Sequence, residues 1–503
     1  MPRELPLDHF CPWREEAEEL RERLTRLETK TAALEKRVFG RKSERMPPVK
    51  KLLRAELSEQ EEAQREEAAL QKRRERAALK EGQATARLIH HKMAEAQRYC
   101  PSCGSRELKP LGAGRQSVVY EYLAARFERQ VHVQETLACA CGKGVVVAPA
   151  PARVVDRGEY GPGFLAHVVA SKCADSLPLH RLAQRIERGG VPMSRSSLTD
   201  SFHQSALALA PLSARLLLRI GQAPVVWADE TPLRVLAVKK THLGYLWTFL
   251  TVNEQGQWLI GYRFSMSRSG KTPQQVLGDT PGALVVDAYT GYNSVTMPGG
   301  RLRVGCWAHV RRKFFSALAT TPEAQAALDF ILSLYRVEAE AARTRVVRML
   351  AHRALRQHQS RPVLQQMHAW LTAQLPLHLP QGPMGKALSY ALNQWEALGR
   401  FVDDEQLPLD NNRSEGALRT AALGRKNFLF VGHEQAGENL AGLYALVATC
   451  QANGINPELY LADVLLRVQT HPNSRIDELL PHQWALARSA EAATEASAAE
   501  AAA

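Results

Sequence analysis

The chain has 503 residues, 45% of them hydrophobic, with 65 Lys and Arg against 52 Asp and Glu, a formal net charge of +13 at pH 7. This length exceeds one compact core and predicts about two to four domains. The positive charge favours a polyanionic partner, because clustered Lys and Arg displace the counterions of phosphates. The N-terminal segment lacks the apolar core of a signal peptide, and no apolar run reaches spanning length. We therefore expect a cytoplasmic protein with no membrane partner.

The first predicted domain, residues 1–54, is a coiled coil with a basic extension. Apolar residues recur at alternating four- and three-residue steps from Leu20 to Val38, with Thr31 interrupting the series. This spacing is typical of the a and d positions of a coiled coil and predicts a homo-oligomer. Because short coils are marginal alone, a helix pair within one chain is the alternative.

A basic run and a charged linker follow the coil. Residues 39–54 carry six basic residues against one acidic. Such a run either contacts DNA, with Arg41 and Lys42 as candidates, or forms a solvated linker. Residues 55–98 are rich in charge and predict a helical linker.

The next predicted domain, residues 99–150, contains two close pairs of cysteines: Cys100 and Cys103, then Cys139 and Cys141. A pair spaced by two residues beside Pro and Gly points two thiolates at one ion, which predicts structural Zn²⁺. The second pair is spaced by a single residue, so His132 is a substitute ligand and plain buried thiols are the alternative.

Residues 151–222 are predicted to be helical and to include a helix-turn-helix-like unit. Two amphipathic stretches flank Gly189-Gly190, and Ser194 is placed to cap the second helix. Helix-turn-helix units read DNA with their second helix, which makes Arg195 a candidate DNA contact. A helical hairpin without DNA-reading function is the alternative.

From Pro224 the hydrophobic period changes from helical to extended. Three β-branched and aromatic runs are separated by turn signals, and short strands then alternate with helices, which predicts a mixed sheet covered by helices. The predicted strands cover residues 223–238, 244–252, 257–264, 282–289 and 301–306, and the helices cover 271–277 and 307–318. The predicted catalytic core has a first part at 223–320 and a last helix at 403–435, separated by a helical insertion at 321–402. A C-terminal element at 436–485 and a disordered tail at 486–503 follow.

Three carboxylates are candidates for one metal site. Asp229 and Asp287 each close an apolar strand, a common place for functional groups in α/β sheets, although Asp also begins turns there. Glu415 lies on a later helix, where it also fits the N3 position of a capping box with Asn412 as N-cap. Carboxylate oxygens suit Mg²⁺ or Mn²⁺, which serve phosphodiester chemistry. Glu230 would point to the opposite face of its strand and is a weaker candidate.

The chain resembles the transposases of the insertion sequence 66 family in six motifs that occur in order: "WADETPLRV", "VVDAYTGYN", "GCWAHVRRKF", "DNNRSEGALR", "GRKNFLFVG" and "NGINPELYLADVL". The resemblance extends to "FGRKSER", the cysteine pairs and "SKCADSLPLHRLAQRIERGGVPMSRSSL", and so covers nearly the whole chain. Two residues depart from the family pattern: Ala288 replaces a Gly, and Gly416 replaces an Arg next to Glu415.

The resemblance implies a multidomain α/β DDE transposase with a ribonuclease-H-like catalytic core, and it implies that Asp229, Asp287 and Glu415 are the catalytic, metal-binding triad. Its partners would be DNA at the element ends and at the target, further copies of the chain, and accessory transposition proteins. The same matching assigns DNA contact or support of the site to six basic residues: His309, Arg311, Arg312, Arg419, Arg425 and Lys426.

The implied reaction is metal-dependent cleavage at the element ends followed by strand transfer. Two rivals share much of the sequence evidence. One is a ribonuclease-H-like nuclease or resolvase without strand transfer. The other is a catalytically silent DNA-binding regulator, which the loss of a cation at Gly416 favours and the intact set of carboxylates disfavours.

Overall fold

A computed structural model describes residues 64, 66–72, 74–75, 130, 132, 136–138, 145–147, 152–155, 158–238 and 240–502. The chain divides into two units, one comprising residues 47–128 and the other residues 1–46 with 129–503. In the smaller unit the described residues, 64 to 75 with two gaps, are helical and exposed. The predicted coiled coil, Arg41, Lys42 and the four paired cysteines lie outside the described residues.

The larger unit begins, in its described part, with a small strand pair and three helices. β1 (Thr136–Ala138) pairs antiparallel with β2 (Val145–Val147). The helices are α4 (Pro162–Cys173), α5 (Leu179–Arg188) and α6 (Arg195–Gly221). Ser194 caps α6 as predicted, since its side chain accepts a hydrogen bond from the Ser197 N–H at 3.0 Å. Gly190 has φ +88°, a conformation that favours glycine, and it makes the turn between α5 and α6.

A mixed sheet forms the centre of the larger unit and confirms the predicted α/β class. Its strands are β3 (Val225–Ala237), β4 (Lys240–Val252), β5 (Trp258–Ser265), β6 (Ala283–Val285) and β7 (Leu302–Val304), in the order β5-β4-β3-β6-β7. The first three strands are antiparallel neighbours, whereas β6 and β7 run parallel to β3. The short strand β8 (Phe430–Val431) also pairs with β3, in parallel.

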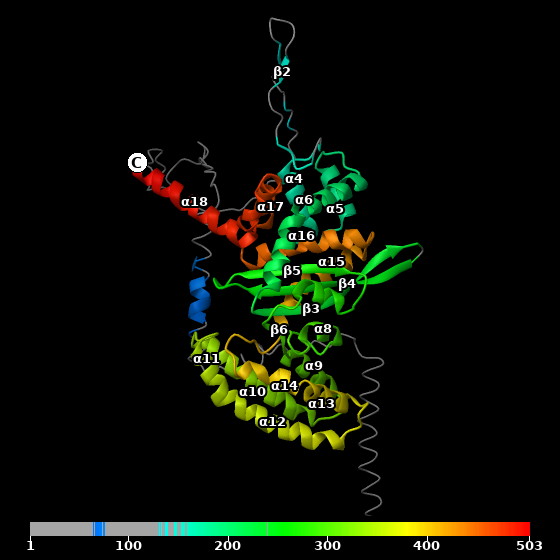
Figure 1. Ribbon diagram of the computed structural model, residues 1–503, viewed down its shortest axis with the longest axis vertical. Coiled ribbons are helices and arrows are strands. Elements are labelled where there is room, and N and C mark those ends of the chain that lie inside the picture. Colours follow the sequence, from blue (N-terminus) through cyan, green and yellow to red (C-terminus); the bar gives the residue numbers. More distant parts are fainter. Residues whose placement is uncertain are drawn as a thin grey trace, which may run out of the picture. The chain divides into compact units, whose positions relative to one another are not determined.

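Helices lie beyond both edges of the sheet (Figure 1). The group of α4, α5, α6, α16 (Glu434–Ala452) and α17 (Pro457–Arg467) lies beyond β5, with α6 and α16 in contact with that strand. The Leu217 side chain of α6 packs against Gly261 of β5. A Cβ atom at position 261 would lie only 2.5 Å from this leucine, so a larger residue would force the leucine to shift. The helix thereby packs directly on the strand.

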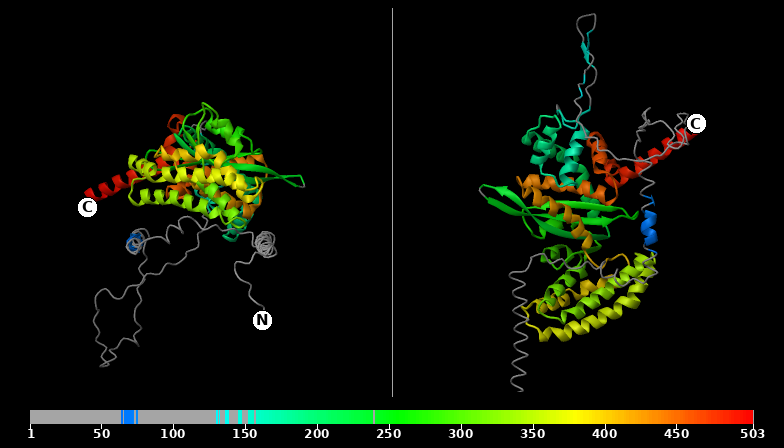
Figure 2. Two further views of the ribbon diagram at one scale, coloured as in Figure 1. Left: turned by 90° about the horizontal axis from the view of Figure 1, so that it is seen from below. Right: turned by 180° about the vertical axis from the view of Figure 1, so that it is seen from behind.

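A second helical group lies beyond β6 and β7 (Figures 1 and 2). The group consists of α9 (Trp307–Leu318), α10 (Ala324–Arg343), α11 (Leu350–Leu355), α12 (Arg361–Gln374), α13 (Pro383–Asn393) and α14 (Trp395–Gly399). Three short elements precede it in the chain: α7 (Lys271–Leu277), a 3-10 turn (Thr290–Tyr292) and α8 (Asn293–Thr296). Shorter helical turns complete it: a π-helical segment (Arg356–Ser360) and 3-10 turns (Leu375–Leu377, Arg400–Val402).

Arg356 fixes the second helical group to the chain that returns to the sheet. Its guanidinium is buried, pairs with Glu338 of α10 at 2.7 Å, and donates to the carbonyls of Phe401, Asp404 and Leu407. Because all these acceptors are buried with it, the arginine serves as an internal brace rather than as a surface charge.

The chain then forms α15 (Asn412–Phe428), which crosses β3 and β4, and ends with a 3-10 turn (Asn473–Leu479) and α18 (Pro481–Ala502). The prediction of a disordered tail at 486–503 is wrong for its described residues, which continue α18 to Ala502. Alanine and glutamate are strong helix formers, and this explains the difference. None of the described helices is long and apolar enough to cross a membrane.

Candidate active site

Two of the three candidate carboxylates are neighbours on parallel strands. Trp227 of β3 lies opposite Val285 of β6. Asp229 lies two residues further along β3, and Asp287 follows the end of β6 by two residues, close enough for its charge to act on Asp229. The Asp229 carboxylate accepts a hydrogen bond from the Glu230 N–H at 2.9 Å, and the Asp287 carboxylate accepts one from the Tyr289 N–H at 2.9 Å.

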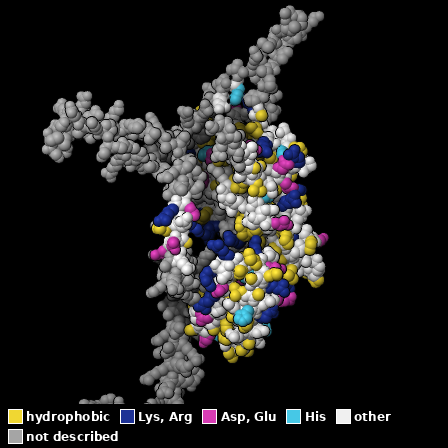
Figure 3. Space-filling view, turned by 90° about the vertical axis from the view of Figure 1, so that its left-hand side faces the viewer, with side chains coloured by type: hydrophobic (Ala, Val, Ile, Leu, Met, Phe, Trp, Pro, Cys, Tyr) yellow, Lys and Arg dark blue, Asp and Glu magenta, His cyan; other side chains and the backbone are white. Residues whose placement is uncertain are grey.

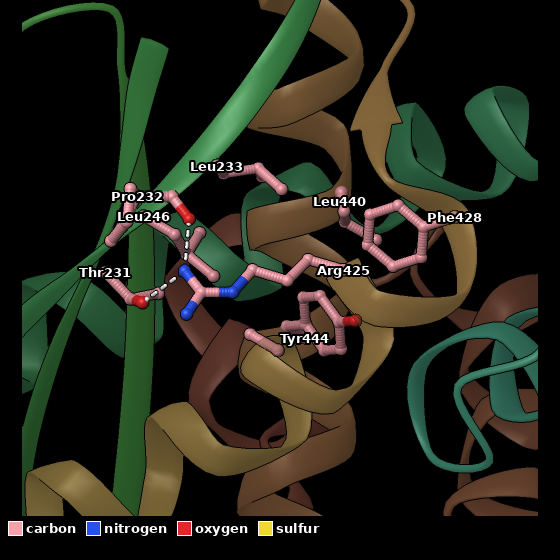
Figure 4. A pocket seen from close by; sticks show the side chains of 9 residues that line it. Thr231, Pro232, Leu233, Leu246, Arg425, Phe428, Leu440 and Tyr444 are labelled. Atoms are coloured by element: carbon pink, nitrogen blue, oxygen red, sulfur yellow. Dashed lines mark hydrogen bonds between the residues drawn. The ribbon is translucent and has the colours of Figure 1, made fainter. Parts of the chain in front are cut away.

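Glu415 comes from the first turn of α15, which is tied to β3 at both ends. Near its N-terminus, the Asn411 side-chain amide donates to the Ala228 carbonyl at 2.8 Å. Near its C-terminus, the Arg425 guanidinium donates to the Thr231 hydroxyl at 2.8 Å and to the Pro232 carbonyl at 2.6 Å (Figure 4). These bonds hold the helix across the strand that carries Asp229.

The three carboxylates interact electrostatically. Burial, together with the negative charges of Glu230, Asp287 and Glu415, raises the pKa of Asp229 to about 7, against the opposing effect of the hydrogen bond from the Glu230 N–H. A carboxyl that remains half protonated near neutral pH marks a site with uncompensated negative charge. Such a site favours a cation.

Replacing Asp229 should stabilise the protein when no divalent ion is present. Between about pH 4 and 7 the unfolded state releases the Asp229 proton while the folded state retains it, so stability falls as pH rises and the penalty is complete above pH 7. Asp229→Asn removes the ionisation and should raise the free energy of unfolding by roughly 2 to 4 kcal/mol at pH 8 in EDTA, with little effect at pH 4. Urea denaturation at both pH values measures this, with the exposed Asp175→Asn as control. Equal stability of wild type and Asp229→Asn at pH 8 would contradict the burial of this charge.

Glu415 forms an ion pair instead of a capping box. Its carboxylate receives the Arg312 guanidinium at 2.8 and 3.1 Å, and the His309 imidazole nitrogen Nε2 lies 3.6 Å away. The N-cap of α15 is Asn411, one residue earlier than the predicted Asn412, and its side chain bonds the Ser414 hydroxyl at 2.6 Å. The capping-box interpretation of Glu415 is therefore wrong.

Arg312 thus provides a positive charge beside Glu415, which the neighbouring Gly416 cannot provide. Arg312 comes from α9, from a motif far from Gly416 in the sequence. A Cβ at Gly416 would meet nothing within 4 Å, so this position is open to solvent. His309 is largely buried, and this burial lowers its pKa.

The donor set fits a divalent metal ion, but the three carboxylates do not close on one point. Among the described residues, no three Asp, Glu, His or Cys side chains lie close enough together to hold a metal ion. The uncompensated charge at Asp229 and the oxygen-only donors match Mg²⁺ or Mn²⁺. Glu415 would have to turn from Arg312 to join the two aspartates.

Glu230 lies on the opposite face of β3 and has other partners. Its carboxylate receives Arg268 at 2.9 Å and the Tyr292 hydroxyl at 2.6 Å, and its side chain is 3% exposed. The Arg268 guanidinium also stacks on the Tyr289 ring. This cluster is not apparent from the sequence, although both tyrosines belong to the motif "VVDAYTGYN".

The predicted DNA-contacting residues separate into two groups. Arg195, Arg312, Arg419 and Lys426 are exposed. Arg311 is only 4% exposed and burial lowers its pKa, so in this structure its side chain lies in the interior, where support of the site is the role it could have. Arg425 donates hydrogen bonds to β3, as described above, and in this way holds α15 against the strand that carries Asp229.

Among the described residues, Cys173, Cys306 and Cys450 are free and buried.

Three family models match the chain. The model "Transposase IS66 family" covers residues 157–439, "zinc-finger binding domain of transposase IS66" covers 97–142, and "IS66 C-terminal element" covers 445–482. The first of these includes all three candidate carboxylates. The second includes all four paired cysteines.

Three uncharacterized proteins of Sinorhizobium fredii (strain NBRC 101917 / NGR234) are similar to the chain. Protein y4hP is 29% identical over 78% of this chain and 74% of its own length, and y4jD is 35% identical over 70% and 72%. Protein y4qI is 32% identical over 67% of this chain and 65% of its own length. These matches and the three family models confirm the resemblance found in the sequence motifs: the chain belongs to the IS66 family of transposases.

Proposed function

We propose that this chain is an active DDE transposase that cleaves DNA at the ends of an insertion sequence and joins the freed ends to a target. Its sheet order supports a ribonuclease-H-like core, since three antiparallel strands are followed by two strands parallel to the first. The convergence of Asp229, Asp287 and Glu415 on one face of this sheet carries the proposal.

The carboxylates Asp229, Asp287 and Glu415 would hold the metal. A bound Mg²⁺ or Mn²⁺ supplies neutralisation of phosphate charge and activation of the attacking oxygen. Arg312 and His309 approach Glu415 from α9 and orient its carboxylate. If Glu415 turned from Arg312 to hold the metal, the Arg312 guanidinium would be free to bind a phosphate oxygen of the DNA.

Both chemical steps are in-line displacements at phosphorus, so one site serves them. In the first, water attacks the phosphodiester, the bond from phosphorus to the 3′ oxygen breaks, and the departing oxygen takes a proton to become a 3′-hydroxyl. In the second, this hydroxyl attacks a target phosphodiester, forms a new bond to phosphorus, and releases a target 3′-hydroxyl.

The cysteine pairs Cys100/Cys103 and Cys139/Cys141 would hold a structural Zn²⁺. Four thiolates close the tetrahedral coordination shell and leave no position for substrate, so this metal would fold a DNA-binding module and take no part in the chemistry. The zinc-finger family model over 97–142 supports this assignment. We further propose that the predicted coiled coil at 1–54 assembles copies of the chain on the two element ends.

The exposed basic residues of α15 should contribute to DNA affinity through phosphates. Each phosphate contact contributes about 0.9 to the slope of log affinity against log salt concentration. Replacing Arg419 and Lys426 together by Gln should therefore lower this slope by about 2, without changing sequence preference. Fluorescence anisotropy with duplex DNA at several salt concentrations measures the slope. An unchanged slope would place the phosphate contacts elsewhere.

The direct test is cleavage and joining in vitro. Full-length protein is incubated with duplex DNA that carries the sequences flanking its gene, with Mg²⁺, Mn²⁺ or EDTA. A transposase yields nicked ends and joined products with metal only. Nicks without joining would favour the nuclease or resolvase, and metal-independent binding without any product would favour the silent regulator.

A further inference from the structure

A pocket of about 430 Å³ lies on the same face of the sheet as the carboxylates. Its floor is apolar and comes from the first residues of β3, β6 and β7 and the last residues of β4, including Val225, Trp227, Val252 and Leu302. Its rim is polar and includes Arg348, Gln406 and Asp404, whose carboxylate accepts a hydrogen bond from the Gln406 N–H at 2.8 Å. A pocket of this size, with an apolar floor and few polar groups, is typical of a small organic ligand.

The pocket continues directly from the carboxylate site. Trp227 precedes Asp229 by two residues on the same face of β3, about 7 Å along the strand. Arg413 lies in the first turn of α15, as Glu415 does, but it is not among the residues that line the pocket. β3 therefore places the pocket beside Asp229, at a separation comparable to one nucleotide of an extended strand.

Two arginines bring positive charge to this place, and neither forms an ion pair with Asp404 or with any other acid that the structure describes. Arg348 makes no hydrogen bond or ion pair through its guanidinium with any residue that the structure describes. Burial and the charge of Arg413 lower its pKa. The Arg413 guanidinium lies 5.1 Å from the ring centre of Trp258, which in turn lies 5.7 Å from the ring of Trp227. Figure 3 shows Lys and Arg side chains gathered in a recess in the middle of one face. The combination of aromatic rings and free guanidinium groups suits a nucleobase and a phosphate.

The backbone at the rim is also strained. Arg345 and Arg348 both have left-handed conformations, with φ of +60° and +63°, although neither is glycine. The Arg348 carbonyl accepts a hydrogen bond from the Gln406 side chain at 3.1 Å, which holds the rim in this form. Strain of this kind accumulates at ligand-binding segments, where it fixes a side chain in place.

We propose that this pocket binds one nucleotide of a DNA strand, next to the phosphodiester at the carboxylates. The base rests on the apolar floor beside Trp227, and the flanking phosphate pairs with Arg348 and Arg413. The pocket admits an unpaired nucleotide only, because a paired base cannot enter a recess of this size. This inference rests on the proposed function. In that function the pocket is a subsite that holds one unpaired nucleotide and so keeps the duplex open next to the cut.

The test measures binding without metal or cleavage. Full-length protein in EDTA is titrated against a labelled single-stranded hexanucleotide, and affinity is read from fluorescence anisotropy. Arg348→Gln removes the rim charge, and Leu302→Trp fills the pocket from a half-exposed position. Each should weaken binding about tenfold. Arg345→Gln is the matched control, because Arg345 shares the loop and the backbone conformation but does not line the pocket, and its affinity should stay within about twofold of wild type.

A hexanucleotide without bases separates base recognition from phosphate contact. It should bind wild type about tenfold more weakly than the normal strand, and Leu302→Trp should then have no further effect. Equal affinity for both strands would overturn the inference and leave Arg348 as a phosphate contact only. Circular dichroism of each variant confirms folding. This experiment measures binding and not cleavage, so the two tests can fail separately. Unchanged oligonucleotide binding in the variants would not affect the cleavage test of the proposed function, and a failed cleavage test would still allow oligonucleotide binding to be measured.

Discussion

Glu415→Gln should abolish DNA cleavage, lowering its rate by at least about 1000-fold, while folding and DNA binding stay near wild type. A neutral amide is a poor ligand for Mg²⁺, and no other described carboxylate on α15 is placed to take over. Glutamine also retains the size of glutamate and a hydrogen-bond acceptor for Arg312. Cleavage of a labelled element-end duplex in Mg²⁺, with anisotropy on the same duplex, measures both properties.

Asp229→Asn and Asp287→Asn should give the same phenotype, because residues that act on one site lose activity as a unit. Glu434→Gln is the matched control, since Glu434 is an exposed glutamate at the start of α16 and undergoes the same chemical change. Retained cleavage in Glu415→Gln would remove Glu415 from the site. Loss of DNA binding in any of the three would indicate a structural rather than a chemical role.

Arg301→Ala should cost about 3 to 5 kcal/mol of stability. Arg301 is 1% exposed, and its guanidinium donates to the carbonyls of Gly221, Ala223 and Ala283 and to the Thr280 hydroxyl. Alanine would remove the donor from the Ala223 and Ala283 carbonyls where α6 meets β6 and would leave the Gly221 carbonyl with the Thr280 hydroxyl alone. Urea denaturation gives the free energy of unfolding.

Arg419→Ala is the control for Arg301→Ala, because Arg419 is exposed on α15. It should change stability by less than about 0.5 kcal/mol and weaken DNA binding. The opposite pattern, a stable Arg301→Ala with weakened DNA binding, would place Arg301 on the DNA surface and contradict its internal role.

The sheet was predictable because its strands carry their own signal. β3, β4 and β5 are runs of β-branched and aromatic residues bounded by turns, and Asp229 is conspicuous at the end of an apolar run. The neighbouring position of Asp287 also follows, because parallel strands bring successive strand ends together. The family resemblance was needed to assign Glu415 to the site, because a glutamate near the start of a helix is otherwise explained as part of a capping box.

The roles of individual basic residues were not predictable from the sequence. Arg301, Arg311 and Arg312 lie in one basic stretch, but the first two are buried and only the third is exposed. Burial of an arginine depends on carbonyls supplied by distant segments, such as Gly221 for Arg301, and no local pattern reveals them. The pocket beside the carboxylates has the same origin, because its lining comes from separate parts of the chain.

The most direct test of the metal site is a crystal of the full-length protein soaked with Mn²⁺ and measured for anomalous scattering. The account predicts a peak between Asp229, Asp287 and Glu415, with the Glu415 carboxylate turned away from Arg312. The peak should disappear in crystals of Glu415→Gln or Asp287→Asn soaked in the same way. A peak at another carboxylate cluster, or no peak with Glu415 still bound to Arg312 at saturating Mn²⁺, would contradict the central claim.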